Sequence, residues 1–341
     1  MTAAAQTRVP GQTAGHSALR RLVADPDAFR RDVWSREALL TRAGELPEGF
    51  TDLFSESALD ELVSRRGLRT PFIRVARDGT TLPNHAFTSG GGVGAGIADQ
   101  VDDAKLSALF AGGATIVLQA LHRTWSPVLD FSQQLAHELA HPLQVNAYVT
   151  PPQSRGFDDH YDVHDVFVLQ VSGRKHWRIH APVVDAPLRD QPWTAHRAAV
   201  EQAAAEPPVI DAVLEPGDCL YLPRGFIHAA TALGDVSTHL TMGIHPWTRH
   251  HLARELLDAA LDELAGDPGI RTSFGAGVEV DDPFAIVGDV ETVRERLAAA
   301  VRSVPADEIA RRLGDRRRSA TRPAPVGPVA QLRASQAPDA D

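Results

Sequence analysis

The sequence predicts an α+β protein in which a β-rich middle segment lies between two helical regions. Between residues 114 and 243, short apolar runs rich in β-branched residues alternate with turn signals. This pattern is typical of a closed or double-sheet β architecture. On both sides of the segment, apolar residues recur at helical spacing, as they do at Leu252, Leu256 and Leu257.

The region before the β-rich segment predicts a short disordered end followed by mixed elements. Residues 1–16 are small and polar, and we expect them to be disordered. Apolar residues between Leu19 and Trp34 have helical spacing, and Ser55 has the pattern of a helix cap. Residues 71–76 then alternate like a strand. We expect residues 17–110 to form α/β elements that pack on the β-rich domain.

The middle region, residues 111–247, predicts the β domain. We expect residues 166–171 and 175–180 to form a hairpin around the turn Ser172–Gly173. Residues 126–141 predict a helix that contains His137, Glu138 and His141, formally the HExxH pattern of zinc peptidases. Pro142 ends this helix at once, so an amphipathic helix is the favoured interpretation. The expected strands are 114–119, 143–150, 166–171, 175–180, 209–214, 219–222, 229–233 and 237–243.

Residues 248–314 predict helices, at about 252–264, 290–301 and 306–313. Their apolar stripes would pack on their own domain or, where exposed, support a homodimer. Residues 315–341 are basic at first and then rich in Pro and Ala, and we expect a disordered tail.

Composition limits the classes of partner. The formal net charge of -10 argues against direct nucleic-acid binding, which requires a basic surface. Cys219 is the only cysteine, which fits a reducing compartment. The sequence has no long apolar run and no apolar leader at its start, so we expect a cytoplasmic protein without a membrane span.

Three residues predict a metal site. His160 and Asp162 lie two residues apart ahead of an apolar run, so in an extended chain both side chains point to the same side. The turn-rich segment 215–228 delivers His228 after a short apolar run. Two imidazoles and one carboxylate on one face of an ion, with the other face open, suit non-heme Fe(II) and its dioxygen chemistry.

The motifs around these residues resemble a known family. The spacing Gly217-x5-Pro223-x-Gly225-x2-His228 is similar to the second cupin motif, and with His160-x-Asp162 it resembles the JmjC-type cupins. More narrowly, residues 159–177, and residues 144–152 before them, resemble the ribosomal oxygenases, which hydroxylate ribosomal proteins. The resemblance implies a double-stranded β-helix of the cupin or jelly-roll type. It also places a winged-helix domain after the helical region, which we expect this chain to lack.

The resemblance also implies roles for individual residues. His160, Asp162 and His228 would hold Fe(II), leaving sites for 2-oxoglutarate and O2. Lys175 matches the position that binds the second carboxylate of the cosubstrate. Asn146 and Tyr148 face the cavity in the same resemblance and would hydrogen-bond the cosubstrate or the substrate. A buried acceptor such as Asp165 would orient a ligand imidazole.

The implied reaction is hydroxylation of an amino-acid side chain in a protein or peptide, coupled to decarboxylation of 2-oxoglutarate to succinate. Asp158 and Asp159, at the mouth of the site, would suit a basic side chain in a ribosomal protein. Two alternatives stay open on the sequence. One is a small-molecule oxygenase of specialised metabolism, and the other is a catalytically silent cupin that binds a metal.

Overall fold

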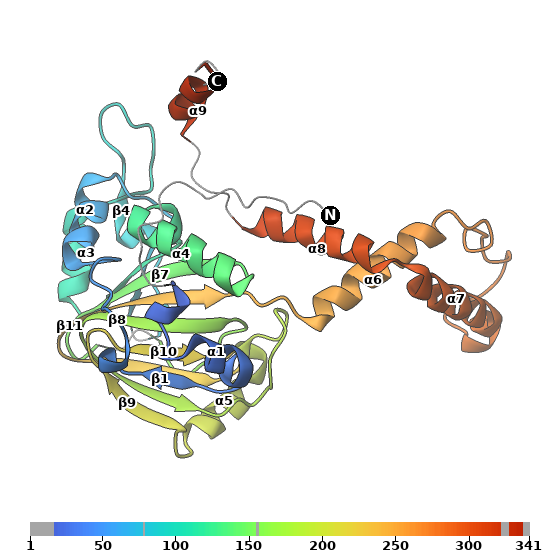
Figure 1. Cartoon of the computed structure of the whole chain (residues 1–341), viewed down its shortest axis with the longest axis horizontal. Coiled ribbons are helices and arrows are strands. Elements are labelled where there is room, and N and C mark those ends of the chain that lie inside the picture. The colour runs from blue at the N-terminus through green and yellow to red at the C-terminus, as the bar shows by residue number, and fades with distance from the viewer. Residues whose placement is uncertain (1–16, 78, 155–156, 322–326, 337–341) are drawn as a thin grey trace, which may run out of the picture. The chain divides into compact units, whose positions relative to one another are not determined.

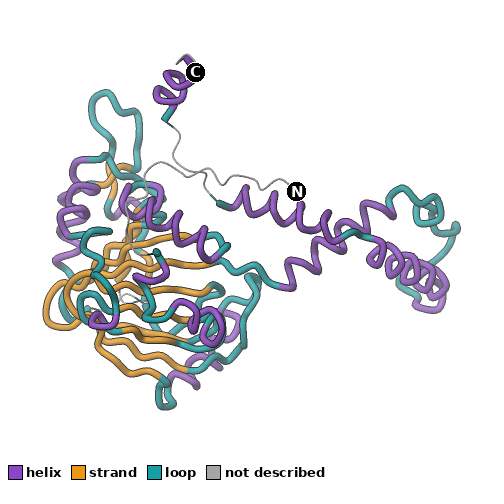
Figure 2. Tube along the Cα trace, in the orientation of Figure 1, coloured by secondary structure: helices purple, strands orange, loops and turns teal. Residues whose placement is uncertain are grey.

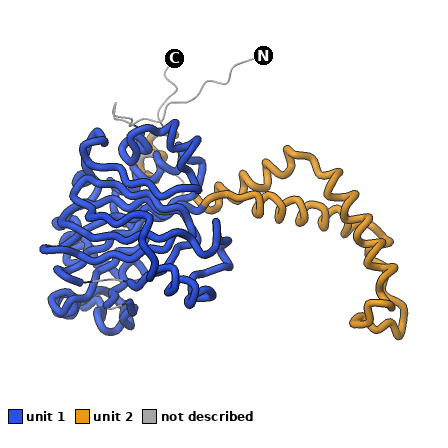
Figure 3. Tube along the Cα trace, turned by 90° about the horizontal axis from the view of Figure 1, so that it is seen from below, with its two compact units in different colours: residues 1–245 blue, residues 246–341 orange. Residues whose placement is uncertain are grey.

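A computed structural model describes residues 17–77, 79–154, 157–321 and 327–336. The expected disordered end, residues 1–16, lies outside the described residues. The chain divides into two compact units, Met1–His245 and Pro246–Asp341, which Figure 3 shows in separate colours. In the described part of the chain, no helix combines the length and the apolar character that crossing a membrane requires.

The first unit is built on a large antiparallel sheet, seen as the orange strands of Figure 2. Its strands follow the order β1-β10-β8-β11-β7-β6-β2-β3, and β9 pairs with β8 beside this path. A separate pair joins β4 to β5. The strands are β1 (Leu39–Thr41), β2 (Ile73–Arg77), β3 (Thr80–Thr81), β4 (Thr88–Ser89), β5 (Gln100–Val101), β6 (Thr115–Leu118), β7 (Leu143–Thr150), β8 (Asp165–His180), β9 (Ile210–Leu214), β10 (Cys219–Leu222) and β11 (Ile227–Ile244).

The expected hairpin at Ser172–Gly173 is wrong, because β8 runs through this point as one strand. β11 likewise runs through Gly234, where the sequence predicts a break between two strands. The two strands pair on both sides of an irregularity at this level. Gly173 has φ +62°, and a Cβ there would lie 2.0 Å from the carbonyl oxygen of Val236. The glycine therefore marks a bulge where two long paired strands bend together.

Helices gather over the strands of the first unit, with α2, α3 and α4 at the top of Figure 1. Ser55 caps α2 as expected, since its hydroxyl accepts from the Ala58 N–H at 3.2 Å. The α-helices are α1 (Pro26–Ala28), α2 (Glu56–Arg65), α3 (Asp103–Ala111), α4 (Ser126–Leu139) and α5 (Arg197–Ala204). Short turns of other helix types are η1 (Leu19–Arg21), η2 (Phe29–Val33), η3 (Ala43–Glu45), η4 (Asn84–Ala86), η5 (Leu121–Arg123) and η6 (Trp193–His196).

The HExxH residues of α4 have structural contacts. The Glu138 carboxylate accepts hydrogen bonds from the backbone N–H groups of Ala18 and Leu19, at 2.8 and 2.9 Å. The His141 ring stacks on Trp34 with 5.4 Å between ring centroids. Glu138 thus tethers the N-terminal segment to α4 instead of serving as a general base, which agrees with the amphipathic-helix interpretation.

One large apolar cluster joins the N-terminal elements to the sheet. At its centre Phe29 packs against Phe167 of β8 and Tyr221 of β10, with ring centroids 5.5 and 4.8 Å apart. All three rings are almost completely buried. The N-terminal elements therefore share a core with the strands that follow the metal-ligand segment.

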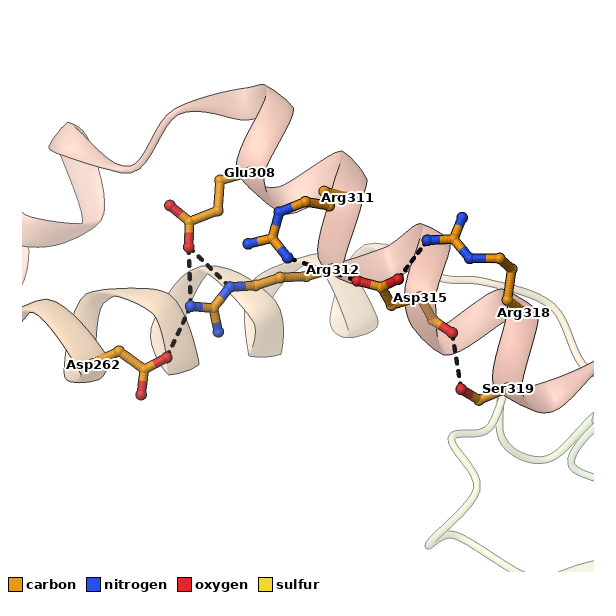
Figure 4. A network of polar contacts seen from close by, with 7 residues as sticks. All are labelled: Asp262, Glu308, Arg311, Arg312, Asp315, Arg318 and Ser319. Carbon is orange, nitrogen blue, oxygen red and sulfur yellow. Dashed lines mark hydrogen bonds and ion pairs between the residues drawn. The ribbon is translucent and has the colours of Figure 1, made fainter.

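The second unit is helical: α6 (Arg249–Leu264), α7 (Pro283–Ser303), α8 (Ala306–Ala320) and α9 (Pro328–Gln336). Its small core includes Ala260, Leu264 and Ala300. Ion pairs join α6 to α8, where Arg312 contacts Asp262 at 2.8 Å (Figure 4).

The expected tail boundary at residue 315 is wrong for the residues described. Helix α8 continues to Ala320, and residues 328–336 form α9. The basic residues that suggested a tail make ion pairs instead. Arg316 pairs with the buried Glu255 of α6. Arg318 pairs with Asp315 within α8 (Figure 4). These ion pairs explain why α8 continues beyond the last residue of its apolar pattern.

Candidate metal centre

The structure brings His160, Asp162 and His228 together. One ligand atom from each residue lies within 4.8 Å of the others. The two histidines are joined through the backbone: His228 N–H donates to the His160 carbonyl at 2.8 Å, and His160 N–H donates to the His228 carbonyl at 3.2 Å. This isolated antiparallel bridge sets the imidazoles next to each other, with ring centroids 4.4 Å apart.

Backbone carbonyls orient both imidazoles. Nδ1 of His160 lies 2.6 Å from the Asp158 carbonyl, and Nδ1 of His228 lies 3.1 Å from the Phe226 carbonyl. Since a carbonyl only accepts, each Nδ1 carries the proton, and each Nε2 keeps its lone pair for a metal. His228 Nε2 accordingly faces Asp162 Oδ2 at 3.8 Å.

The expectation that Asp165 orients a ligand imidazole is wrong. Its carboxylate accepts from the Tyr221 hydroxyl at 2.6 Å, from the Ser35 hydroxyl at 2.7 Å and from the Arg224 N–H at 3.1 Å. Asp165 therefore fastens the turn before His228 to the start of β8.

The protonation states of His228 and Asp162 suit a divalent cation. Burial, together with the neighbouring His160, lowers the pKa of His228 to about 4, so the ring is neutral at pH 7. Burial by itself would raise the pKa of Asp162, but the His164, His228 and His160 rings hold it below its ordinary value. An ionised carboxylate and neutral imidazoles are the forms that bind metals.

Lys175 lies deep in the same unit and is only 4% exposed. Its amine donates to the Thr150 hydroxyl at 3.2 Å, and the described residues give it no acidic partner. Burial lowers its pKa to about 7. A buried cation without a counter-ion is costly, so its environment is incomplete without an anion.

Asn146 and Tyr148 lie on one face of β7. The Asn146 side-chain oxygen accepts from the Ala120 N–H at 3.1 Å. The Tyr148 ring stacks on His239 with 4.9 Å between centroids. Burial raises the pKa of Tyr148 and lowers that of His239 well below its usual value, and the charge of Lys175 adds to the latter shift.

Several residues near the centre were not predicted from the sequence. The rings of Phe157 and Trp193 lie on the His160 imidazole, at 6.0 and 6.2 Å between centroids. An arginine guanidinium lies over each aromatic ring. That of Arg74 is 5.2 Å from the Phe157 ring centroid, and that of Arg197 is 4.4 Å from the Trp193 ring centroid. Phe157 lies three residues before His160, so the sequence could have placed it near the site. Arg74 and Trp193 are far from His160 in the sequence, and only the folded chain brings them close to it.

The two acidic residues at the mouth differ in their surroundings. Asp159 lies 3.5 Å from Arg178, and one of its carboxylate oxygens is buried without a hydrogen-bond partner among the described residues. The carbonyl of Asp158 is occupied by His160, while its exposed carboxylate lies beside Gly79. The charge of Asp159 is therefore partly balanced within the chain.

The fold and the site together define a class of protein. Residues 124–252 match the family model of the JmjC domain. This segment, which holds all three residues of the metal centre, is therefore similar to the JmjC-type cupins, and the large antiparallel sheet with its flanking helices has the α+β jelly-roll architecture.

The chain is also similar to the ribosomal oxygenases. It is 33% identical over 228 residues to ribosomal oxygenase 1 of Homo sapiens, covering 64% of this chain and 33% of the relative. It is 44% identical over 236 residues to the Culex quinquefasciatus protein named bifunctional lysine-specific demethylase and histidyl-hydroxylase NO66, covering 64% and 32%. The chain thus spans about a third of the length of these curated relatives.

A solved structure has the same fold. The Escherichia coli ribosomal oxygenase YcfD, in complex with cobalt and 2-oxoglutarate, superposes with a TM-score of 0.51 at 19% sequence identity. The match covers 82% of this chain and 66% of that chain.

Proposed function

We propose that this chain is an Fe(II)- and 2-oxoglutarate-dependent dioxygenase that hydroxylates an amino-acid side chain in a protein, with a ribosomal protein as the substrate. The observation that carries the proposal is the pairing of two features in one unit. One is a set of two imidazoles and one carboxylate, and the other is a buried lysine that has no acidic partner among the described residues. The first suits Fe(II), and the second suits a carboxylate.

The residues present fit the proposed metal. His160 and His228 would each offer Nε2, because their Nδ1 atoms face backbone carbonyls, and Asp162 would offer a carboxylate oxygen. When bound, a ferrous ion and 2-oxoglutarate would supply the oxidising chemistry with O2. The relatives' names, ribosomal oxygenase and histidyl-hydroxylase, support this reaction type, as does the cobalt and 2-oxoglutarate complex of the Escherichia coli protein.

The remaining roles follow from side-chain chemistry. The Lys175 ammonium would hold the distal carboxylate of the cosubstrate, where burial strengthens the charge pair. The Thr150 hydroxyl beside it would share the same ligand. Neutral His239 and the Trp177 ring, 5.5 Å apart, would fill the space between this end and His228 and exclude water.

The entrance supports a protein substrate with a basic side chain. Phe157 and Trp193 flank His160 and offer flat apolar surfaces on which an aliphatic or planar side chain can pack. The Asp159 carboxylate, which Arg178 balances only from 3.5 Å, would add negative charge at the entrance that the sequence predicts. Such a combination suits a cationic or imidazole-bearing residue.

Two measurements test the proposal. The purified protein should form succinate from 2-oxoglutarate in a reaction that depends on added Fe(II). Mass spectrometry should then find a ribosomal protein that lacks the mass of one oxygen atom in a deletion strain and regains it when the gene is restored. Absence of succinate formation would favour a silent cupin, and succinate formation with unchanged ribosomal proteins would favour a small-molecule oxygenase.

We also propose that the helical unit supports a homodimer. Large apolar side chains on α7 recur at every third residue and are exposed, with Phe284 at 87% and Val287 at 56%. On α6, Leu257 and Leu261 lie one turn apart and are exposed as well. Light scattering after gel filtration should give twice the chain mass for the wild type, and Leu257→Glu with Leu261→Glu should give a monomer.

A further inference from the structure

The turn at residues 223–226 contacts the segments that carry two of the three candidate metal ligands. The Gly225 N–H donates to the Asp162 carbonyl at 3.0 Å, and the Phe226 carbonyl faces Nδ1 of His228 at 3.1 Å. The Phe226 N–H also closes the turn with a hydrogen bond to the Pro223 carbonyl at 3.3 Å. A displacement of the 223–226 turn would therefore move Asp162 and His228 relative to each other.

One buried carboxylate holds this turn in place. Asp165 is completely buried, and its Oδ1 accepts from the backbone N–H of Arg224 at 3.1 Å. Its Oδ2 accepts from the Tyr221 and Ser35 hydroxyls, at 2.6 and 2.7 Å. The Arg224 guanidinium lies 3.5 Å from Oδ1 and balances the charge. Since hydrogen bonds to an ionised carboxylate are about twice as strong as neutral ones, both oxygens of Asp165 have firmly held partners.

The network extends from Asp165 into the N-terminal segment, outside the residues that match the JmjC domain. Ser35 donates its hydroxyl to Asp165 and its backbone N–H to the Tyr221 hydroxyl, the latter at 2.9 Å. The neighbouring Trp34 ring stacks on Tyr221 and on His141, with centroids 6.0 and 5.4 Å apart. Ser35 has φ +54°, a left-handed conformation that a residue other than glycine keeps only where its surroundings hold it. The contacts of Trp34 and Ser35 provide that hold.

The position of the 223–226 turn matters because metal affinity depends on how well the ligands are placed before the ion arrives. Ligands have to be held within about 0.5 Å of their bound positions. The backbone hydrogen bonds between His160 and His228 join the third ligand to the same turn. Among the described residues, the Asp165 carboxylate bonds to no ligand side chain, so its effect on the ion passes through the backbone of the turn.

We propose that Asp165 and Ser35 are positioning residues for the metal centre, which act through the 223–226 turn. The N-terminal segment thereby sets the affinity for a divalent cation, although it supplies no ligand. This inference rests on the proposed function only for the presence of that cation at His160, Asp162 and His228.

Binding of Mn²⁺ alone, measured by calorimetry on the full chain, tests the role of Asp165. In Asp165→Asn the side chain offers one acceptor atom instead of two, so the donors of Tyr221, Ser35 and Arg224 cannot all keep their present bonds. The affinity for Mn²⁺ should fall about 10- to 30-fold, within the range for outer partners of metal ligands. The visible absorption bands of bound Co²⁺, which report the arrangement of its ligands, should shift in the same variant.

Asp218→Asn is the matched control for burial and hydrogen bonding. Asp218 is 3% exposed, and its carboxylate accepts from the backbone N–H groups of Ala43 and Glu215, at 2.9 and 3.0 Å, and from the Arg42 guanidinium at 2.7 Å. It lies before β10, whereas the 223–226 turn follows this strand. Both Asn variants should unfold at lower urea. Asp218→Asn should bind Mn²⁺ within about twofold of the wild type and leave the Co²⁺ bands in place.

Ser35→Gly tests the N-terminal end of the network. Glycine adopts the same left-handed backbone conformation without strain, so the variant loses the hydroxyl alone. The affinity for Mn²⁺ should fall about 2- to 5-fold, the effect of one hydrogen bond transmitted in part. This variant also decides the matter if Asp165→Asn does not fold, because an unchanged affinity in Ser35→Gly would then overturn the inference.

The outcomes separate this inference from the proposed function. Equal Mn²⁺ affinities and equal Co²⁺ bands in Asp165→Asn and Asp218→Asn would overturn the positioning role and leave the proposed function intact. A wild type that binds Mn²⁺ but forms no succinate would refute the proposed function, while the comparison of the two variants would still decide the inference. Failure of the wild type to bind Mn²⁺ would refute the metal centre and both proposals with it.

Discussion

The two units of this chain use charge in opposite ways. In the first unit the buried Lys175 has the Thr150 hydroxyl as its hydrogen-bond partner among the described residues, and Asp162 is surrounded by imidazoles. In the second unit the buried Glu255 pairs with Arg316, and Arg312 pairs with both Asp262 and Glu308. The helical unit thus pairs its charges within its own helices. The first unit pairs some buried charges internally, as it does Asp165, but it also holds a buried lysine that has no acidic partner among the described residues.

The sharpest test of this difference is removal of a metal ligand. His228→Ala should reduce metal affinity by more than about 100-fold, since even partners of ligands contribute 10- to 100-fold, and succinate formation should fall to background. Metal content after dialysis measures the first effect. His176→Ala is the control, because this imidazole is bound to Asp211 at 2.5 Å and lies on the other face of β8. Equal metal loss in both variants would contradict the assigned centre.

Replacing the buried lysine should separate binding from stability. Lys175→Met is expected to weaken 2-oxoglutarate binding about 10- to 100-fold, the range for a charge-assisted hydrogen bond. The same variant should unfold at higher urea in the ligand-free protein, because the buried charge has no acidic partner among the described residues. Loss of both binding and stability would show that the amine serves the fold.

The pH dependence of binding follows from the lowered pKa of Lys175, about 7 against an ordinary 10.5. Below pH 7 the free protein already carries the charge, so affinity for 2-oxoglutarate should be flat. Above pH 7 binding must take up a proton, and affinity should fall about tenfold per pH unit. Between pH 7 and 10.5, Lys175 of the ligand-free protein is protonated in the unfolded chain but not in the folded one. The free energy of unfolding should therefore rise with pH in that range. Calorimetry in buffers of different ionisation heat detects the proton uptake, which Lys175→Met should abolish.

The bend in the paired long strands can be tested by two glycine substitutions. Gly173→Ala should destabilise the first unit by about 1–3 kcal/mol, because φ is +62° and the new Cβ would meet the Val236 carbonyl. Gly234→Ala has a similar φ of +74°, but its nearest neighbour is the flexible Arg174 side chain at 3.5 Å. Urea unfolding should therefore show the smaller loss at Gly234, and a reversed order would contradict the close approach.

The smallest effect should come from the helical unit. Glu255→Gln keeps the shape of a buried side chain but removes its charge pair with Arg316, and should cost about 1 kcal/mol, less in high salt. Asp258→Asn, which lies 3.4 Å from the same arginine and is 46% exposed, should change the melting temperature less. An equal response in the two variants would mean that burial does not matter to this pair.

The sequence predicted those parts of the site that depend on residues close together in the chain. His160 and Asp162 are two residues apart, and the turn pattern before His228 places one imidazole at a strand start. Lys175 follows from the family pattern. The N-cap of α2 was likewise visible at Ser55.

What the sequence did not predict depends on long-range pairing. Gly173 looks like a hairpin turn until β11 is seen to run beside it on both sides. Arg74 is one of several alternating residues in a short strand, and only the register with Val117 and Tyr148 brings it to the site. Asp165 was expected to accept a hydrogen bond from a ligand imidazole. Its carboxylate instead accepts hydrogen bonds from Tyr221, Ser35 and Arg224.

The reciprocal backbone hydrogen bonds between His160 and His228 have a consequence for metal exchange. Since peptide groups hold the two ligands side by side, little chain ordering remains for the ion to bring about. Chelation should leave a folded apoprotein that takes up ferrous, cobalt or manganese ions in turn. Spectroscopic reporters could then be introduced without refolding.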